Sequence, residues 1–190
     1  MSWAISSMPQ SATARHVRGA GFTLVELMIT LAVMVILISI ATPGFIGVAQ
    51  NNRAATQANE LLSALHIARS EAATRGVPVS VCASANTTSC AGASDWAQGW
   101  IVFTDAVAPS GSVDAGDAVL RTSPGLVGGA TLTARRGGTP VSFVRYFPLG
   151  FLDTTADVQF QLRVPKCVRD SNRDVVISPA GKPGVTHIAC

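Results

Sequence analysis

The sequence has little that could support catalysis. It contains only three histidines, and no Ser-His-Asp set, HExxH helix, phosphate-binding loop or dinucleotide fingerprint is present. Asp105, Asp114 and Asp117 share one polar segment and could approach a calcium ion, but their spacing is not that of a known calcium loop. We therefore expect a protein that is not an enzyme, uses no cofactor, metal or small-molecule substrate, and keeps these aspartates in a solvated loop.

Positive charge is too scarce to indicate nucleic-acid binding by bulk charge. The formal net charge is +3, and two arginines, Arg15 and Arg18, lie in the first 21 residues. Without that segment the side chains sum to +1. A nucleic acid would therefore have to be bound by a local cluster.

What the sequence does have is one long apolar run, residues 22–40, with Glu26 as its only charge. A helix needs about 20 apolar residues to cross a bilayer. The preceding segment carries Arg15, His16 and Arg18 and no acid close by, which predicts a cytoplasmic N-terminus and a remainder on the far side of the membrane.

Glu26 is out of place in such a helix. A carboxylate costs about 2.5–3.5 kcal/mol at the middle of a bilayer, and less near a helix end. No lysine or arginine lies within the run to act as its partner. Either another chain supplies the partner, or the carboxylate lies at the interface or is protonated and has no role.

The residues around Glu26 resemble the type III signal of type IV prepilins and pseudopilins: Gly21-Phe22-Thr23-Leu24-Val25-Glu26-Leu27. The resemblance implies that prepilin peptidase cuts between Gly21 and Phe22 and that Phe22 becomes N-methylated. It also implies that Glu26 neutralises the terminal amine of a neighbouring subunit during assembly. Pro43 matches the proline that interrupts the family's first helix. The implied partners are the peptidase, the inner membrane and other pilins or pseudopilins, contacted through the N-terminal helix.

The chain divides into three expected segments. Residues 1–21 are a leader peptide without an apolar core before a small-residue cut site, so they are not an ordinary secretory signal. Residues 22–50 are the transmembrane or filament-core half of a long helix. Residues 51–190 form one periplasmic domain of ordinary size. The expected location is therefore the bacterial inner membrane as a single-pass protein, and a pilus or pseudopilus after assembly.

The helix is expected to run from Phe22 to about Arg75, with a bend or local melting at Pro43 and Gly44. Its second half has apolar residues at three- and four-residue spacing, which predicts a stripe that packs on a sheet. Gly76 suits the end of the helix. The expected stripe comprises Ala55, Ala58, Leu62, Leu65, Ala68 and Ala72, and Leu61 widens it.

Short runs rich in valine, isoleucine, threonine and aromatics follow the helix, separated by glycine, proline, serine and aspartate. One long helix followed by short strands predicts an α+β protein of type IV pilin-like form, with the helix packed on an antiparallel β-sandwich or sheet pair. The eight expected strands are residues 77–82, 99–104, 118–122, 130–134, 141–147, 158–164, 174–178 and 185–189.

The four cysteines all follow the apolar run, in a compartment that favours disulfides. Four cysteines allow three pairings. We favour Cys82 with Cys90 and Cys167 with Cys190, because both bridges join elements adjacent in sequence. Zinc is the alternative use, but no CxxC motif is present and the histidines have no ligand spacing.

The domain resembles the GspH/FimT group of minor pilins and pseudopilins. The residues that carry this resemblance are Ala68-Arg69-Ser70-Glu71-Ala72, Val81-Cys82, the segment from Asp95-Trp96 to Trp100-Ile101-Val102-Phe103, and the closing strand and turn from Arg173 to Gly181. The cysteines favour the FimT-like, type IV pilus side of the group. We expect Trp96 and Trp100 to pack in the core.

Members of the FimT branch are associated with DNA binding through a Gly-Arg-x-Arg turn after the closing strand. Here the turn is Gly181-Lys182-Pro183-Gly184, with one basic residue. Phosphate binding relies on several basic side chains together. A patch is possible if the C-terminal hairpin gathers Lys166, Arg169, Arg173 and Lys182; the alternative is solvated charge, countered by Asp170 and Asp174.

The resemblance therefore implies three functions. The chain is expected to be a minor type IV pilin that joins or primes a pilus. The first alternative is the equivalent pseudopilin H of a type II secretion system, at the tip of the filament. The second is a DNA-binding subunit carried by the pilus for natural transformation.

Overall fold

The structure is a computed structural model that describes residues 21–167 and 170–190, with residues 41–46 described by their backbone alone. The chain divides into two compact units, one ending at Thr42 and the other beginning at Pro43. A single helix, α1 (Leu24–Arg75), contributes to both units. The expected helix is therefore confirmed to within two residues at its start.

The helical backbone runs through Pro43 and Gly44 without interruption, so local melting, one of the two expected effects, does not occur. A proline inside a helix removes one backbone hydrogen bond, while the surrounding turns keep theirs. Gly76 ends the helix as expected, with φ +68° and its N–H bonded to the Ala72 carbonyl at 3.0 Å. Within the residues described with their side chains, no helix offers an apolar stretch long enough to cross a membrane.

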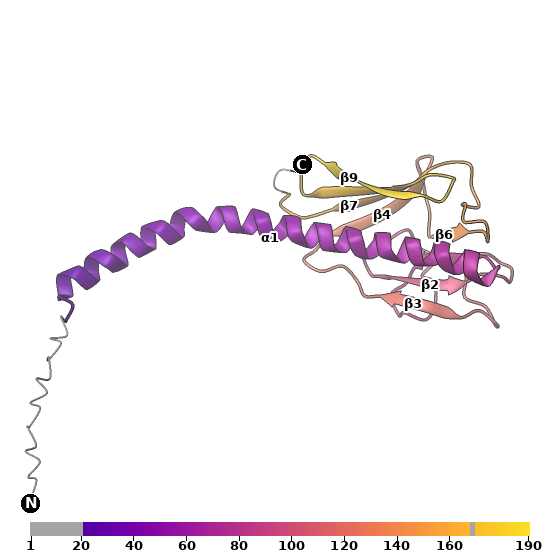
Figure 1. Cartoon of the computed structure of the whole chain (residues 1–190), viewed down its shortest axis with the longest axis horizontal. Helices are drawn as coiled ribbons and strands as arrows, with labels where there is room; N and C mark the ends of the chain where they lie inside the picture. Colours follow the sequence, from indigo (N-terminus) through magenta and orange to yellow (C-terminus); the bar gives the residue numbers. More distant parts are fainter. Residues whose placement is uncertain (1–20, 168–169) are drawn as a thin grey trace, which may run out of the picture. The chain divides into compact units, whose positions relative to one another are not determined.

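The unit that begins at Pro43 contains two antiparallel sheets (Figure 1). The first has the order β3-β2-β1-β6 and the second has the order β5-β4-β7-β8-β9. All eight expected strands are present, and the two-residue β5 is an addition that the sequence did not indicate. The bounds are β1 Val79–Ala83, β2 Trp100–Thr104, β3 Val119–Ser123, β4 Thr131–Arg136, β5 Thr139–Pro140, β6 Phe143–Tyr146, β7 Val158–Arg163, β8 Asn172–Ile177 and β9 Pro183–Ile188.

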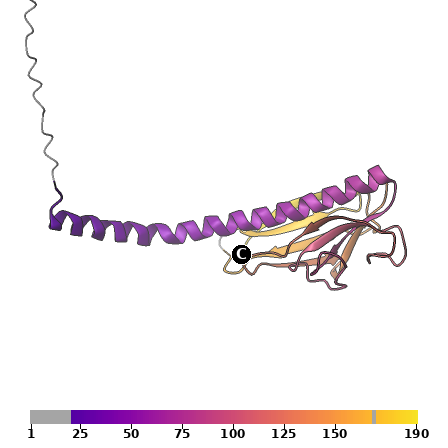
Figure 2. The ribbon, with the colours of Figure 1, turned by 90° about the horizontal axis from the view of Figure 1, so that it is seen from below.

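One hydrophobic core joins α1 to both sheets, which lie on the same side of the helix (Figure 2). This arrangement confirms the expected fold class. The buried stripe is rotated slightly from the expected one, because Ala55 and Leu62 are only half-buried while other positions are fully covered. The stripe that packs on the sheets comprises Ala54, Ala58, Leu61, Ala64, Leu65, Ala68 and Ala72.

Trp96 and Trp100 are completely buried, as expected. The Trp96 indole N–H donates to the Val141 carbonyl at 3.0 Å, and its ring packs edge-on against Phe160 with centroids 4.8 Å apart. Edge-to-face pairs of this kind add to the stability gained by burial alone. The tryptophans therefore belong to the scaffold.

Candidate functional site

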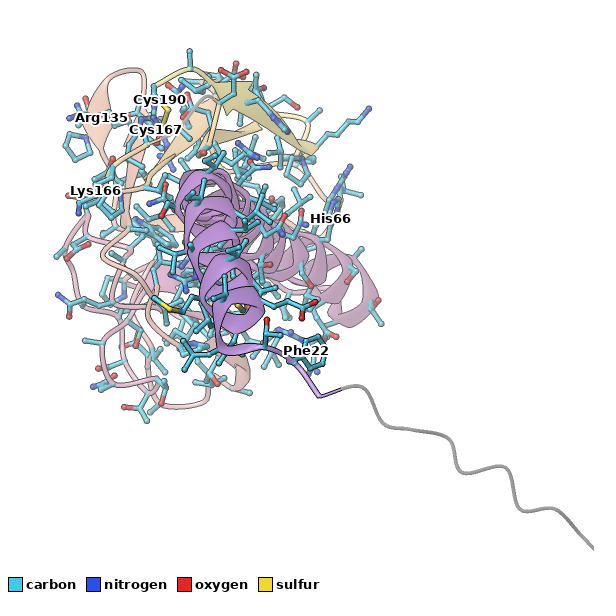
Figure 3. All side chains as sticks on the ribbon, turned by 90° about the vertical axis from the view of Figure 1, so that its left-hand side faces the viewer. Phe22, His66, Arg135, Lys166, Cys167 and Cys190 are labelled. Carbon is cyan, nitrogen blue, oxygen red and sulfur yellow. A yellow bond between two sulfur atoms is a disulfide. The ribbon has the colours of Figure 1, made fainter. Side chains whose placement is uncertain are left out.

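The first candidate site is the start of α1. Gly21 and Phe22 precede the helix and are exposed, and Phe22 keeps 81% of its surface accessible (Figure 3). A Cβ added to Gly21 would meet no described atom within 4 Å, so nothing within the described structure demands a glycine there. A demand for glycine at this position would have to come from another molecule, such as a peptidase.

Thr23 caps the helix, a role that the sequence interpretation missed. The Glu26 backbone N–H donates to Thr23 Oγ1 at 3.2 Å, and the Leu27 N–H donates to the Thr23 carbonyl at 3.1 Å. The spacing Thr-x-x-Glu is the sequence signature of a capping box, so the signal was available. It was hidden because the same residues also form the prepilin-like signal.

Glu26 lies in the first turn of α1, and its side chain is exposed. The positive end of the helix dipole favours a carboxylate at this position. No ion pair joins Glu26 to another residue within the described ranges.

Two disulfides join Cys82 to Cys90 and Cys167 to Cys190, the pairs that sequence adjacency favoured. The first contributes to a small cluster with Ile101, Phe103 and their neighbours on the outer face of the first sheet. The second ties the segment before β8 to the end of the chain, and Figure 3 shows Cys167 and Cys190 together. Both bridges therefore fix loops and leave no cysteine free for a metal among the described residues.

The basic residues do not form the patch that was considered. Arg173 is 2% exposed, so it is unavailable to phosphates and its assignment to the patch is wrong. It points toward α1 and donates to Asn51 Oδ1 and to the carbonyls of Asp170 and Asn172. Arg173 therefore ties β8 to the helix. Asp174, expected to counter surface charge, is also buried and pairs with Arg163 at 2.6 Å.

Lys166 and Lys182 are exposed but lie at opposite ends of β8. Lys166 follows Val164, whose N–H donates to Asn172 at the start of β8. The Lys182 carbonyl accepts from Ser178, just past the end of the strand. Six residues of strand place the two lysines about 20 Å apart. Arg169 lies outside the described residues.

The turn that carries Lys182 is fixed by tight packing. Gly181 has φ +74°, and a Cβ there would lie 2.0 Å from the Gly150 carbonyl oxygen. Arg69 from α1 donates to the Ala180 carbonyl at 3.2 Å. The turn therefore rests on the loop between β6 and β7, close to the C-terminal end of the helix.

Family models match both parts of the chain. The model described as "Prokaryotic N-terminal methylation motif" matches residues 18–42, which contain the signal and the helix start. The model described as "Type II transport protein GspH" matches residues 57–181, well over half of the sequence. The chain belongs to the GspH family.

This GspH-family chain also resembles solved structures of a type IV minor pilin. Two crystal forms of the type IV minor pilin FimU from Pseudomonas aeruginosa match it, one at 28% identity and TM-score 0.53 and the other at 25% and 0.51. The first alignment covers 71% of this chain and 89% of FimU; the second covers 69% and 90%. No curated protein matches the chain. The chain is therefore a type IV pilin-like protein of the minor pilin and pseudopilin class.

In this GspH-family domain, Asp105 departs from the solvated loop that was expected. Its side chain is fully buried and accepts hydrogen bonds from Ser80 Oγ at 2.5 Å and from the Gly111 N–H at 3.0 Å. The Arg145 guanidinium lies 3.4 Å away, which compensates the buried charge. Asp105 therefore anchors the loop. The Asp114 N–H donates to Asp117 Oδ2 at 3.1 Å, and the Asp117 N–H donates to the Asp114 carbonyl at 3.0 Å. Sequence reasoning missed this because Ser80 and Arg145 are 25 and 40 residues away along the chain.

Proposed function

We propose that this chain is a minor type IV pilin, processed by prepilin peptidase and then incorporated into a pilus or used to prime its assembly. Its role is structural, with no enzymatic step. Residues 1–21 are the leader, residues 22–50 the membrane and filament-core segment, and residues 51–190 the periplasmic domain. Cleavage falls between Gly21 and Phe22, and Phe22 carries the methyl group.

The observation that carries this proposal is the pairing of a prepilin-type signal with a FimU-like domain in one chain. The methylation motif covers residues 18–42, and the domain resembles a type IV minor pilin over 71% of the chain. A pilin needs both parts, because the signal directs processing and the domain contacts the neighbouring subunits in a filament. The two cysteine bridges add support for the pilus side of the family.

The exposed apolar surface of α1 supports a membrane location followed by packing among other helices. Every large apolar side chain from Phe22 to Ile40 is at least 49% exposed. A contiguous apolar surface of this kind is typical of an interaction site. Lipid in the inner membrane and neighbouring helices in a filament would each cover it.

The capped helix start supports the assembly role of Glu26. After cleavage the new amine belongs to Phe22, and Glu26 lies one helical turn further on. Because the carboxylate and the amine are only one turn apart, they can pair between neighbouring subunits when one subunit is shifted along the helix axis by about one turn relative to the other. The pair would remove the cost of an isolated charge in an apolar bundle.

A pseudopilin of a type II secretion system is the second candidate, favoured by the description of the matching family model. Deleting the gene in the source bacterium separates the two roles. We expect fewer surface pili and unchanged protein secretion. A secretion defect with normal pili would overturn the pilus assignment.

Complementing the deletion with Glu26→Ala tests the assembly role. We expect normal leader removal by intact mass and a reduced share of the protein in sheared filaments relative to membranes. Incorporation equal to that of the unchanged protein would remove the proposed role of Glu26.

DNA binding during natural transformation is the weakest of the three candidates. The exposed lysines near β8 lie at opposite ends of the strand, and Arg173 is buried. Two separated lysines give weak phosphate affinity, because each neutralised phosphate contributes its own counterion release.

A further inference from the structure

Arg53 is the first charged residue after the apolar part of α1. The sequence has no charged residue between Glu26 and Arg53. The segment proposed to occupy the membrane ends at residue 50, and three further residues of helix advance by about 4.5 Å. The headgroup region adds about 5–7 Å to each side of the hydrocarbon. A helix that occupies the membrane up to residue 50 therefore places Arg53 at the level of the headgroups.

Val127 and Gly128 lie against Arg53, although they come from the segment that connects β3 to β4. A Cβ built on Gly128 would lie 3.7 Å from Nη1 of Arg53. Val127 is 65% exposed, and its carbonyl accepts a hydrogen bond from Gln57 Nε2 at 2.9 Å. The segment therefore holds an exposed apolar side chain in a fixed position beside the cation.

Lys166 brings a second cation to the same end of the domain. Pro165, which precedes it, lines a recess of about 50 Å³ together with Arg53 and Val127. The Gln50 side chain donates to the Pro165 carbonyl at 3.5 Å. Arg53 and Lys166 are exposed, and neither takes part in an ion pair within the described ranges. We call Arg53, Val127 and Lys166 the proximal surface.

Most acidic side chains near this end point elsewhere. None of the residues that line the recess is acidic. Glu60 is seven residues beyond Arg53, about 10 Å farther along α1 from the membrane segment. Arg173 bonds to the Asp170 carbonyl and to Asn51, so Asp170 lies on the Asn51 side of the helix. Asn51 and Arg53 point about 160° apart around the helix axis.

One anion does lie close to Lys166. The disulfide between Cys167 and Cys190 brings the chain's terminal carboxylate next to the residue that follows Lys166. Pro165, on the other side of Lys166 in the chain, is the residue that shares the recess with Arg53. The carboxylate therefore offsets Lys166 more than Arg53, and Arg53 is the stronger of the two cations.

We propose that the proximal surface docks on the headgroups of anionic lipids in the membrane from which α1 emerges. Arg53 and Lys166 meet lipid phosphates, and Val127 enters the boundary between headgroups and acyl chains. Such binding combines buried apolar area with attraction to anionic lipid. The docking rests on the proposed membrane location of the first half of α1. It holds the domain of an unassembled subunit in one orientation on the membrane.

Full-length protein in lipid nanodiscs tests the docking. Val127→Cys carries a dye whose emission shifts to the blue in an apolar environment, while the four native cysteines are paired and stay unlabelled. The discs contain phosphatidylcholine alone or an equal mixture with phosphatidylglycerol. We expect a blue shift in the anionic discs only. High salt should reverse it, because salt screens the attraction between exposed charges.

Val107→Cys is the matched labelling control. Val107 is 45% exposed and follows Asp105, whose N–H donates to the Pro78 carbonyl just past the end of α1. It therefore lies at the opposite end of the domain from Arg53, and its dye should not respond to anionic lipid. Equal blue shifts at Val107 and Val127 would overturn the docking.

Charge-matched variants separate the proximal surface from total charge. Arg53→Gln should lower the ratio of docked to undocked protein about fivefold, the contribution of one basic residue near an anionic membrane. Lys166→Gln should lower it less. Arg121→Gln and Lys182→Gln remove the same charge from exposed positions outside the surface and should change nothing. Equal losses in both pairs of variants would overturn the docking.

The discs also distinguish failure of the docking from failure of the proposed function. If the protein enters the discs and the dye at Val127 ignores anionic lipid, the docking is wrong and the membrane location stands. If the dye responds while deletion of the gene leaves the pili unchanged, the pilin role is wrong and the docking stands. If the protein does not enter the discs, the proposed membrane segment is wrong and the docking falls with it.

Discussion

The two halves of α1 differ in side-chain size and in exposure. From Phe22 to Ile40 the large apolar side chains are all at least 49% exposed. From Ala54 to Ala72 a stripe made mostly of alanine is buried against two sheets. Small side chains let the sheets approach the second half closely, whereas large side chains on the first half offer area to lipid or to other helices. One helix thus serves the fold at one end and, in the proposed function, assembly at the other.

The largest expected effect concerns processing at the start of α1 and leaves the stability of the domain unchanged. Gly21→Leu should abolish leader removal, because the proposed cut follows this glycine. Intact mass measures the uncut precursor. Gly184→Leu is the matched control, since a Cβ at Gly184 also meets nothing within 4 Å. Normal processing of the Gly21 variant would contradict the cleavage position, and the unfolding of the domain should be unchanged in both variants.

A pair of equal truncations compares the two halves directly. Leu65→Ala should lower the free energy of unfolding by about 2–5 kcal/mol, because Leu65 is fully buried and its removal leaves a cavity. Leu27→Ala removes the same atoms from a side chain that is 55% exposed and should leave unfolding unchanged. Denaturant unfolding followed by the fluorescence of the buried tryptophans measures both. Equal losses in the two variants would show that the halves are not distinct.

The polar tie between the helix and β8 gives a smaller effect. Arg173→Ala removes bonds from a charged group to Asn51 and two carbonyls, so we expect a loss of about 1.5–3 kcal/mol. Lys166→Ala, at an exposed site, should change unfolding by less than about 0.5 kcal/mol. Identical stability of the two variants would mean that Arg173 is not structural.

Features set by local sequence were predictable, whereas contacts between residues distant along the chain were not. The start of the helix, its end at Gly76 and eight strand positions were predictable, because glycine placement and side-chain periodicity are local. The role of Arg173 was not, because its partner Asn51 is 122 residues away and an arginine in a polar segment is usually exposed. Four members of the expected stripe are buried, whereas Ala55 and Leu62 are half-buried and Ala54 and Ala64 are buried in addition. A helix that faces two sheets buries a wider face than spacing alone indicates.

The candidate site divides in the same way. Gly21, Phe22 and Glu26 could be recognised because the signal is contiguous. Thr23 could have been recognised as a cap, but one motif concealed another. The burial of Asp105 was beyond prediction, because its partners Ser80 and Arg145 are 25 and 40 residues away along the chain.

The smallest expected effect tests how tightly the turn at Gly181 packs against the second half of α1. Tyr146 is fully buried beside the turn that Arg69 holds, and its hydroxyl has no hydrogen-bond partner within the described structure. Burial raises the pKa of the Tyr146 hydroxyl above its ordinary value, and Arg69 lowers that pKa by a smaller amount. Folding therefore favours the protonated phenol.

The sign of the pH dependence follows from that shift. The contribution of Tyr146 to stability is fully present below about pH 10, where an unfolded tyrosine titrates, and falls as the pH rises above it. Tyr146 is the only tyrosine in the sequence, so phenolate absorbance reports it alone. We expect no phenolate signal until the domain unfolds, and Tyr146→Phe should be neutral or slightly stabilising at pH 7 and less sensitive to alkali. A phenolate that forms near pH 10 in the folded protein would mean that water reaches Tyr146, and that the packing between the turn and the helix is open.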